Sequence, residues 1–331
     1  MGRLSAVAHT KVPVEVAVGD ILGSAQPTSI RGWAMLPRSD HGPTRTLVYC
    51  LAGGGCATAY FDLHVEGCNG YSMAEYFCDR GFMVVALDHP GIGASDPVPD
   101  LFVITPTLVA KCHDRAVREI RDRLASGRLA PEAPPVGEPT VVGLGHSMGG
   151  LIAVVQQGLW QSFDVLVLLG HSGFGLPEVL TEAESQLATG APDLLEREEQ
   201  IEVLARRRFA VPSAVPRRQP ARGAFFADDV PMEVRQAFAR AAVPLLFTCG
   251  LASMIPHSAD AQAASIDVPV FLCIGDQDLT ADRYAAIGLF RSAPYATVYL
   301  LHDSGHCHNQ ASSRARLWGR VVKWIGHISE Q

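Results

Sequence analysis

No run of about 18 consecutive apolar residues, the length that crosses a bilayer as a helix, occurs anywhere in this sequence. The first twenty residues also lack the continuous apolar stretch of a secretory signal. We therefore expect neither a membrane span nor a leader. The sequence also lacks a large excess of charge of either sign, because 27 basic and 34 acidic residues leave a formal net charge of only −7. That balance gives no reason to expect nucleic acid or an anionic membrane as a partner.

The cysteines lack any paired spacing, and several lie inside apolar runs, where a reduced cysteine behaves as a small hydrophobic residue. We therefore expect no disulfide framework and a reducing compartment, most simply the cytoplasm. The eight are Cys50, Cys56, Cys68, Cys78, Cys112, Cys249, Cys273 and Cys307.

Apolar residues, by contrast, are abundant at 48% of 331 residues, enough for one large core with a smaller attached module. Residues 12–18 alternate valine with other residues, and an apolar stretch follows at 30–36. This period of two predicts an antiparallel pair of strands at a sheet edge.

From Thr46 onward, short continuous apolar runs are separated by helix-length segments. This pattern is typical of a parallel sheet covered by helices on both faces, and the strands predicted are 47–51, 82–87, 140–144, 165–169, 268–274 and 296–301. The fold class we predict is α/β, with a mostly parallel sheet of eight strands. The covering helices predicted are 72–79, 105–124, 149–160, 281–290 and 311–325, of which the second opens with Thr105 as N-cap and Pro106 at the first helical position.

One interval breaks the alternation, because no strand pattern occurs between residues 170 and 268. About 90 residues is too long for a plain connection. Amphipathic patterns predict helices at 177–187, 193–207 and 231–242, with a proline- and arginine-rich loop at 212–222. The insertion leaves the carboxyl edge of the sheet, where ligands bind in such folds. We therefore predict a core of residues 1–170 and 266–331, with a helical cap at 171–265.

The insertion also holds a local basic stretch, for which two interpretations stay open. The arginines form either a solvated surface or a clamp for an anionic substrate group. They are Arg206, Arg207, Arg208, Arg217, Arg218 and Arg222.

A serine lies between a predicted strand and a predicted helix, in the segment Gly145-His146-Ser147-Met148-Gly149. A tight strand-to-helix turn strains the serine backbone and lifts its hydroxyl above the sheet. Bulk two residues before or after the serine would collide, which explains the glycines. The N-terminus of the following helix favours negative charge at this point.

A serine nucleophile needs a base, and the base needs an orienting acid, which this layout places after the last two strands. The strand 268–274 is followed by Asp276 and Asp278, and the strand 296–301 by His302, His306 and His308. The three histidines could also hold a metal, but no glutamate or cysteine at a familiar ligand spacing accompanies them. We expect no metal there.

These segments resemble those of the α/β-hydrolase superfamily over residues 48–325. The resemblance rests on the turn 88–95 (Asp-His-Pro-Gly-Ile-Gly-Ala-Ser), the serine turn, the Gly-x-x-Asp turn and the late Gly-His pair. It implies Ser147 as nucleophile, Asp278 as acid and His306 as base. The insertion resembles nothing that we can name.

The resemblance also implies an oxyanion hole, a pair of N–H donors for the negative oxygen that acyl transfer generates. One donor is the backbone N–H of Met148. The other comes from the segment 51–56 (Leu-Ala-Gly-Gly-Gly-Cys), for which Gly54 is our choice and Gly55 its rival and a candidate substrate contact. Ala52 stands where the family usually has a histidine, so the usual anchor of this loop is missing.

Further residues near these loops have two interpretations. His171, just past the strand 165–169, faces the substrate or packs in the core. Cys56 and Cys307 are expected to be apolar packing residues. Phe225, Phe226 and Phe247 either line an apolar pocket or form the cap's own core.

The function we predict is hydrolysis of a small to medium, fairly apolar ester or lactone through an acyl-enzyme, with no metal, nucleotide or organic cofactor. A homodimer is left open. Serine at the turn argues against the epoxide hydrolases and haloalkane dehalogenases of this superfamily, which use aspartate there. The alternatives are cleavage of a carbon–carbon bond in an anionic keto acid and a non-enzymatic receptor with an inert pocket.

Overall fold

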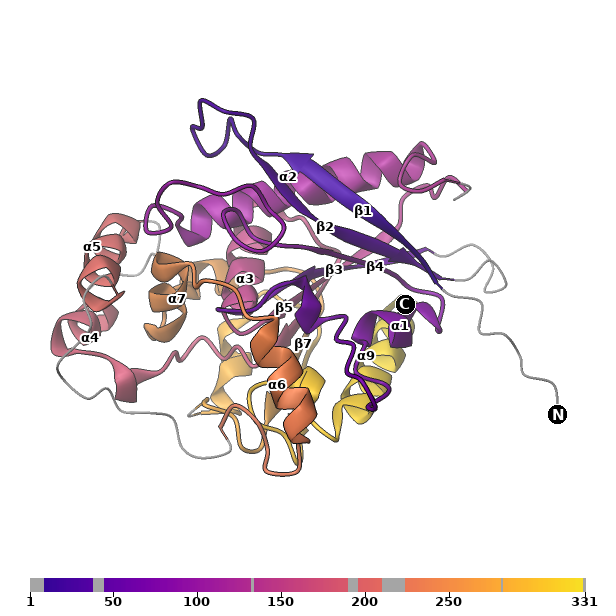
Figure 1. Cartoon of the computed structure of the whole chain (residues 1–331). Coiled ribbons are helices and arrows are strands. Elements are labelled where there is room, and N and C mark those ends of the chain that lie inside the picture. Colours follow the sequence, from indigo (N-terminus) through magenta and orange to yellow (C-terminus); the bar gives the residue numbers. More distant parts are fainter. Residues whose placement is uncertain are drawn as a thin grey trace.

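Figure 1 shows the computed structural model of the chain, in which residues 9–37, 45–131, 134–189, 196–209, 224–280 and 282–329 are described. Within these residues, a central sheet has the order β1-β2-β4-β3-β5-β6-β7-β8. The strands are β1 (Thr10–Ala17), β2 (Ser29–Leu36), β3 (Thr46–Leu51), β4 (Met83–Leu87), β5 (Thr140–His146), β6 (Val165–Leu169), β7 (Val270–Gly275) and β8 (Ala296–Leu301). The predicted eight-stranded α/β architecture is confirmed.

The edge of the sheet is antiparallel, as its alternating sequence predicts. β1 pairs with β2, placing Val14 opposite Gly32, and β2 pairs antiparallel with β4. Val14 and Val16 are buried while Glu15 between them is exposed. The remaining neighbours, from β4 through β3 to β8, pair in parallel.

Alternate side chains of the central strands enter two separate cores, which is why their sequences are apolar throughout. Leu47 and Tyr49 of β3 pack on the side of α2 (Pro106–Ala125) and α3 (Met148–Trp160). Val48 and Cys50 pack on the other side, where α1 (Met73–Cys78) and α9 (Arg314–Ser329) lie together in Figure 1. In the described part of the chain, no helix is both long and apolar enough to cross a membrane.

The helix boundaries follow the predicted capping. The Thr105 hydroxyl accepts a hydrogen bond from the Leu108 N–H, and Pro106 is the first residue of α2. One predicted helix is wrong, because the segment 281–290 forms only a 3₁₀ turn at Ala285–Leu289, with residue 281 outside the described residues. Gly288 disfavours a regular helix in this segment, and a short 3₁₀ turn suffices as a connector.

The described residues of the interval after β6 contain helices and no strand, as predicted, but the helix predicted at 177–187 is divided into a 3₁₀ turn and a separate α-helix. It contains η3 (Pro177–Val179), α4 (Glu182–Thr189), α5 (Glu198–Phe209), α6 (Met232–Arg240), α7 (Phe247–Met254) and α8 (Asp260–Ser265). The sequence pattern predicted neither α7 nor α8, and the predicted loop 212–222 lies outside the described residues. α8 packs directly on α3, since a Cβ on Gly158 would lie 2.6 Å from the Gln262 Cβ. The division of the chain at residue 265 remains a prediction.

Candidate active site

Ser147 occupies a turn of a single residue between β5 and α3. Its backbone has φ 55° and ψ −121°, a strained combination for a residue with a side chain. A Cβ on Gly145 would lie 2.4 Å from the Gly149 carbonyl oxygen, and a Cβ on Gly149 would lie 2.1 Å from the Leu51 carbonyl oxygen. Gly145 is therefore required by the tightness of this turn, and Gly149 by the close approach of the end of β3.

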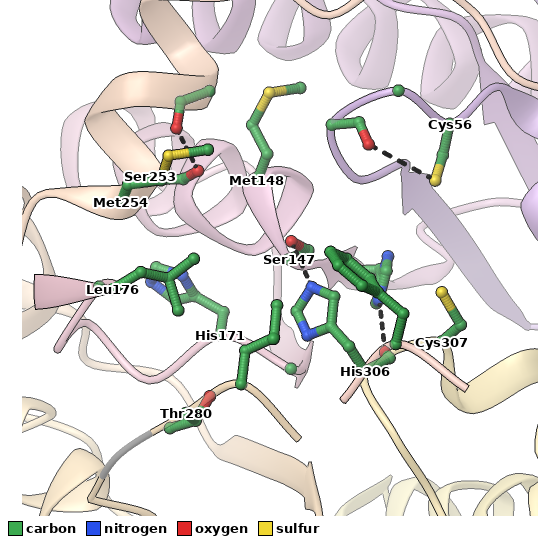
Figure 2. Close-up of a pocket in the computed structure, with 18 of the residues that line it drawn as sticks. Cys56, Ser147, Met148, His171, Leu176, Ser253, Met254, Thr280, His306 and Cys307 are labelled. Carbon is green, nitrogen blue, oxygen red and sulfur yellow. Dashed lines mark hydrogen bonds between the residues drawn. The ribbon is translucent and has the colours of Figure 1, made fainter. Parts of the chain in front are cut away.

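The hydroxyl of Ser147 meets a histidine and an aspartate from the far end of the chain. His306 Nε2 lies 2.7 Å from Ser147 Oγ, and His306 Nδ1 lies 2.7 Å from Asp278 Oδ1. Figure 2 shows the ring of His306 directed at Ser147. Because a carboxylate only accepts, Nδ1 carries the proton in this pair and Nε2 is left to accept from the serine hydroxyl.

The two candidate aspartates have different surroundings. The Asp278 side chain is fully buried and also accepts a hydrogen bond from the Leu279 N–H at 2.6 Å. Burial by itself would raise the pKa of Asp278, but the charge and hydrogen bond of His306 outweigh burial and hold the pKa well below its usual value. Asp276 instead accepts from the backbone N–H groups of Asp303 and Ser304, both at 3.1 Å. Asp276 therefore joins the loops after β7 and β8 and does not reach the His306 ring.

The histidines that flank His306 do not contact the serine. His302 is exposed and lies 3.4 Å from Asp276. His308 is fully buried, with Nδ1 2.9 Å from the Gly305 carbonyl oxygen and Nε2 3.5 Å from Asp278 Oδ2. The three histidines thus diverge, and they do not form the metal site considered above.

Elsewhere in the described chain, Asp62, His64 and Glu75 have ligand atoms close enough together to hold a metal ion. The ammonium group of Lys11 contacts the Asp62 carboxylate, however, and His64 and Glu75 are exposed. The Lys11 charge already neutralises Asp62, so we assign no role to this cluster.

The glycine loop after β3 lies against the serine turn. A Cβ on Gly53 would lie 3.1 Å from the Ser147 Cβ, and one on Gly54 would lie 3.9 Å from the Met148 Cβ. The backbone N–H of Met148 begins α3, where an N–H has no acceptor within its own helix. The residues predicted as N–H donors therefore flank Ser147.

A cavity of about 360 Å³ opens above Ser147. The described residues that line it include no lysine, arginine, aspartate or glutamate. Its apolar walls come from the cap and from the loops at the carboxyl edge of the sheet: Leu176, Phe225, Val243, Leu245, Met254 and Leu279. Such a cavity suits an uncharged ligand of small to medium size.

His171 lines this cavity, as one of its two sequence interpretations requires. Burial and the nearby charge of His306 lower the pKa of His171 to about 4, so its ring is neutral at physiological pH. Its ring has no hydrogen-bond partner among the described residues. His171 therefore offers one donor and one acceptor beside Ser147.

The thiols and aromatic rings near the site separate into two groups. Burial raises the pKa of Cys56 to about 12 and that of Cys307 well above its usual value, so both remain protonated packing residues. The Phe225 ring lies edge-on to His306, with the ring centroids 5.9 Å apart. Phe226 packs on Phe238 within the cap, whereas Phe247 stacks on Phe102 and so joins the cap to the core.

The described arginines of the basic stretch do not line the cavity. Arg206 pairs with Asp100 and Glu202 on the surface. Arg208 forms a buried pair with Glu184. Arg217, Arg218 and Arg222 lie outside the described residues. For Arg206 and Arg208, the structure thus speaks against the clamp, one of the two interpretations left open by the sequence, because each has a carboxylate partner away from the cavity.

Backbone hydrogen bonds from the cap to both loops of the site were not predictable from sequence patterns. The N–H groups of His306 and Cys307 donate to the carbonyl oxygens of Ala224 and Phe225, at 2.7 and 2.9 Å. The Val243 N–H donates to the Gly55 carbonyl oxygen at 3.1 Å. The segment that contains α6 thus joins the histidine loop to the glycine loop.

The chain belongs to the α/β-hydrolase family, whose family model, described as "Alpha/beta hydrolase family", matches residues 48–318. The match includes the serine turn, both candidate aspartates and all three late histidines. No protein of curated function matches the chain.

Solved structures share the fold at low sequence identity. An esterase from Exiguobacterium antarcticum superimposes with a TM-score of 0.62 at 15% identity, covering 95% of this chain and 99% of that one. A bromoperoxidase from Bacillus anthracis has a TM-score of 0.62 at 15% identity, covering 97% and 100%. An N-acyl homoserine lactonase has a TM-score of 0.56 at 14% identity, covering 97% and 98%. At these identities the likeness concerns the fold, which carries several chemistries.

Proposed function

We propose that this protein is a serine hydrolase that cleaves an uncharged carboxylic ester or lactone through an acyl-enzyme. The observation that carries the proposal is the continuous contact from Ser147 Oγ through the His306 ring to Asp278, with both distances at 2.7 Å, beneath a cavity without charged walls. This arrangement generates a nucleophile at neutral pH and orients its base.

In the first half of the reaction, Ser147 Oγ attacks the carbonyl carbon while His306 Nε2 takes the hydroxyl proton. The Asp278 carboxylate holds the imidazole in the required tautomer and stabilises its positive charge. The Met148 and Gly54 N–H groups receive the negative oxygen. When the carbon–oxygen bond of the ester breaks, His306 returns the proton to the leaving alkoxide.

In the second half, a water molecule replaces the alcohol. His306 removes a proton from this water as it attacks the acyl carbon, and the bond to Ser147 Oγ breaks. The proton passes from His306 to that oxygen, which restores the serine and releases a carboxylic acid.

The cavity favours a neutral substrate over the anionic keto acids of carbon–carbon bond hydrolases. A carboxylate buried without a cationic partner costs several kcal/mol. The described wall offers histidine rings, thiols, hydroxyls and apolar groups, and neither lysine nor arginine. An uncharged ester or lactone of modest size avoids this cost.

We further propose that Gly55 and His171 contact the substrate, with the neutral ring of His171 hydrogen-bonded to a polar atom of the acyl or alcohol part. The substitution His171→Leu should raise KM several-fold for esters that carry such an atom and leave simple alkyl esters unaffected. His171→Gln keeps a donor and an acceptor and should restore most of the difference. Equal effects of His171→Leu on both kinds of ester would contradict this role.

The test of the proposed function combines covalent labelling with a substrate panel. A fluorophosphonate should label the wild type at Ser147, and Ser147→Ala should lose labelling and at least about 10⁴-fold in turnover while keeping its circular dichroism spectrum. The panel contains p-nitrophenyl esters of increasing chain length, lactones and an anionic vinylogous keto acid.

Turnover of the neutral esters or lactones supports the proposal. Exclusive turnover of the keto acid would replace it with carbon–carbon bond hydrolysis. A folded wild type that neither reacts with the fluorophosphonate nor turns over any compound would indicate the inert receptor.

A further inference from the structure

A row of buried polar side chains leads away from the start of the glycine loop, and none of its members lines the cavity. Tyr49 Oη lies 2.7 Å from His113 Nδ1, His113 Nε2 lies 2.7 Å from His89 Nδ1, and His89 Nε2 lies 2.9 Å from the Ala52 carbonyl oxygen. The three side chains belong to fully buried residues of β3, α2 and the turn after β4. The mechanism above uses none of them.

The Ala52 carbonyl oxygen at the end of the row fixes which atom donates in each of its hydrogen bonds. A carbonyl oxygen only accepts, so His89 Nε2 carries a proton and donates to Ala52. Complete burial lowers the pKa of both histidines, which keeps each ring neutral with one proton. His89 Nδ1 therefore accepts from His113 Nε2, and His113 Nδ1 accepts from the Tyr49 hydroxyl. Every polar atom of both rings has a partner of the right kind.

The acceptor lies where the glycine loop begins. Ala52 follows the last residue of β3 and precedes Gly53 and Gly54, and a Cβ on Gly149 would lie 2.5 Å from the Ala52 carbonyl oxygen. Three successive glycines impose little conformational restraint of their own. The direction of the Gly54 N–H therefore depends on contacts that hold the loop from outside.

The turn after β4 supplies such contacts at both ends of the loop. His89 donates to the Ala52 carbonyl oxygen, and the neighbouring Asp88 carboxylate accepts from the Thr58 N–H at 2.7 Å. Asp88 also accepts from the Ala94 N–H at 2.8 Å, which makes its own turn rigid. The loop from residue 52 to residue 58 is thus held between two adjacent side chains.

We infer that His89, oriented by His113 and Tyr49, is a positioning residue that aims the glycine loop at the reacting oxygen and takes the place of the histidine that the loop itself lacks at Ala52. This inference rests on the proposed function, because it concerns the N–H groups that receive the oxyanion. Tyr49, His89 and His113 would then act on the reaction through the glycine loop, in addition to packing in the core.

The test compares His89→Leu with His89→Gln. Leucine removes both hydrogen bonds at similar size, whereas the glutamine amide can donate to Ala52 and accept from His113. With p-nitrophenyl butyrate, His89→Leu should lower kcat by about 10- to 100-fold, less than the loss on removing an oxyanion donor outright, and should change KM by less than about threefold. His89→Gln should recover most of kcat. The fluorophosphonate labelling rate should follow kcat in both variants.

A matched control separates positioning from general loss of stability. Ile120 is fully buried on α2, the helix that carries His113, and is not part of the row. Ile120→Ala should lower the urea midpoint at least as much as His89→Leu does, yet keep wild-type kcat at 25 °C. Tyr49→Phe removes one hydroxyl at the far end of the row and should lower kcat severalfold without a change in KM, which keeps the test open if His89→Leu does not fold.

Wild-type kcat in folded His89→Leu and Tyr49→Phe would overturn the inference while leaving the proposed function intact. An equal loss of kcat in Ile120→Ala would also overturn it, because the effect would then report stability. A wild type inert towards fluorophosphonate and esters is a different result, which removes the proposed function and this inference together.

Discussion

The choice of acid illustrates what single residues decide in this site. Asp276 and Asp278 are two positions apart on one short loop, yet only Asp278 lies against the His306 ring. The Asp276 carboxylate is directed at backbone N–H groups of the neighbouring loop. Similar sequence positions thus give one carboxylate that contacts the His306 ring, the base in our proposal, and one that supports the loop behind it.

We expect Asp278→Asn to lower kcat by about 10³- to 10⁴-fold, because an amide can donate to Nδ1 and so stabilises the wrong tautomer. Asp276→Asn should lower kcat less than about tenfold and the free energy of unfolding by about 1 kcal/mol, since the amide oxygen still accepts one of the two backbone hydrogen bonds. Steady-state kinetics and urea denaturation of both variants measure these effects. A larger kcat loss in Asp276→Asn would identify Asp276 as the acid.

At the scale of elements, the segment around α6 is a fixed part of the site. Its start accepts hydrogen bonds from the backbone of His306 and Cys307, and its end donates to Gly55. The Phe225 side chain at its start lies against the His306 ring and is 46% exposed. Movement of this segment would break the hydrogen bonds to both loops at once, so we expect α6 to stay in place when substrate enters.

Phe225→Ala should raise KM for long-chain esters about three- to tenfold and that for acetate esters much less. About 1 kcal/mol of apolar contact with a longer acyl chain is lost, while a half-exposed ring contributes little to stability. The comparison of p-nitrophenyl acetate and octanoate measures this difference. Met232→Ala, on the exposed side of α6 at 60% exposure, is the matched control and should leave both KM values unchanged. Equal KM shifts for both esters would show that Phe225 does not contact the acyl chain.

At the scale of the whole molecule, several histidines of the described chain have a lowered pKa. Burial lowers the pKa of five of them in the described chain: His89, His113, His146, His171 and His308. In the unfolded chain each has a pKa near 6.5. Below that pH the unfolded state therefore binds more protons than the folded state, and stability falls as the pH falls.

We expect the free energy of unfolding to be highest above pH 7. It should fall between pH 7 and pH 5 by about 2 kcal/mol for each buried histidine that stays neutral in the folded state. Together these losses should lower the free energy of unfolding by several kcal/mol between pH 7 and pH 5. The lowered pKa of Asp278 acts in the same direction, but only below about pH 4. Urea denaturation at pH 7, 6 and 5 measures the slope.

His171→Gln provides the control for this slope. It should reduce the difference in the free energy of unfolding between pH 7 and pH 5 by about the contribution of one histidine. An unfolding free energy that is constant over this range would mean that the buried histidines bind protons equally well in the folded state.

The sequence alone determined the features that depend on neighbouring residues. Continuous apolar runs predicted the parallel strands, because such strands are buried on both faces. Gly145 and Gly149 around Ser147 predicted the tight turn. The clash that Gly145 avoids lies within the turn itself, whereas Gly149 avoids a clash with the Leu51 carbonyl oxygen, which only the tertiary structure brings close. The order of serine, aspartate and histidine followed from the order of the strands.

Tertiary structure decided the features that join distant segments. β3 lies between β4 and β5 in the sheet, so the turn carrying His89 meets the glycine loop 37 residues earlier in the chain. The backbone hydrogen bond between Ala224 and His306 and the uncharged wall of the cavity likewise depend on how the helices pack above the sheet. Local patterns carry no signal for such contacts, because their energy arises only when separate elements are packed together.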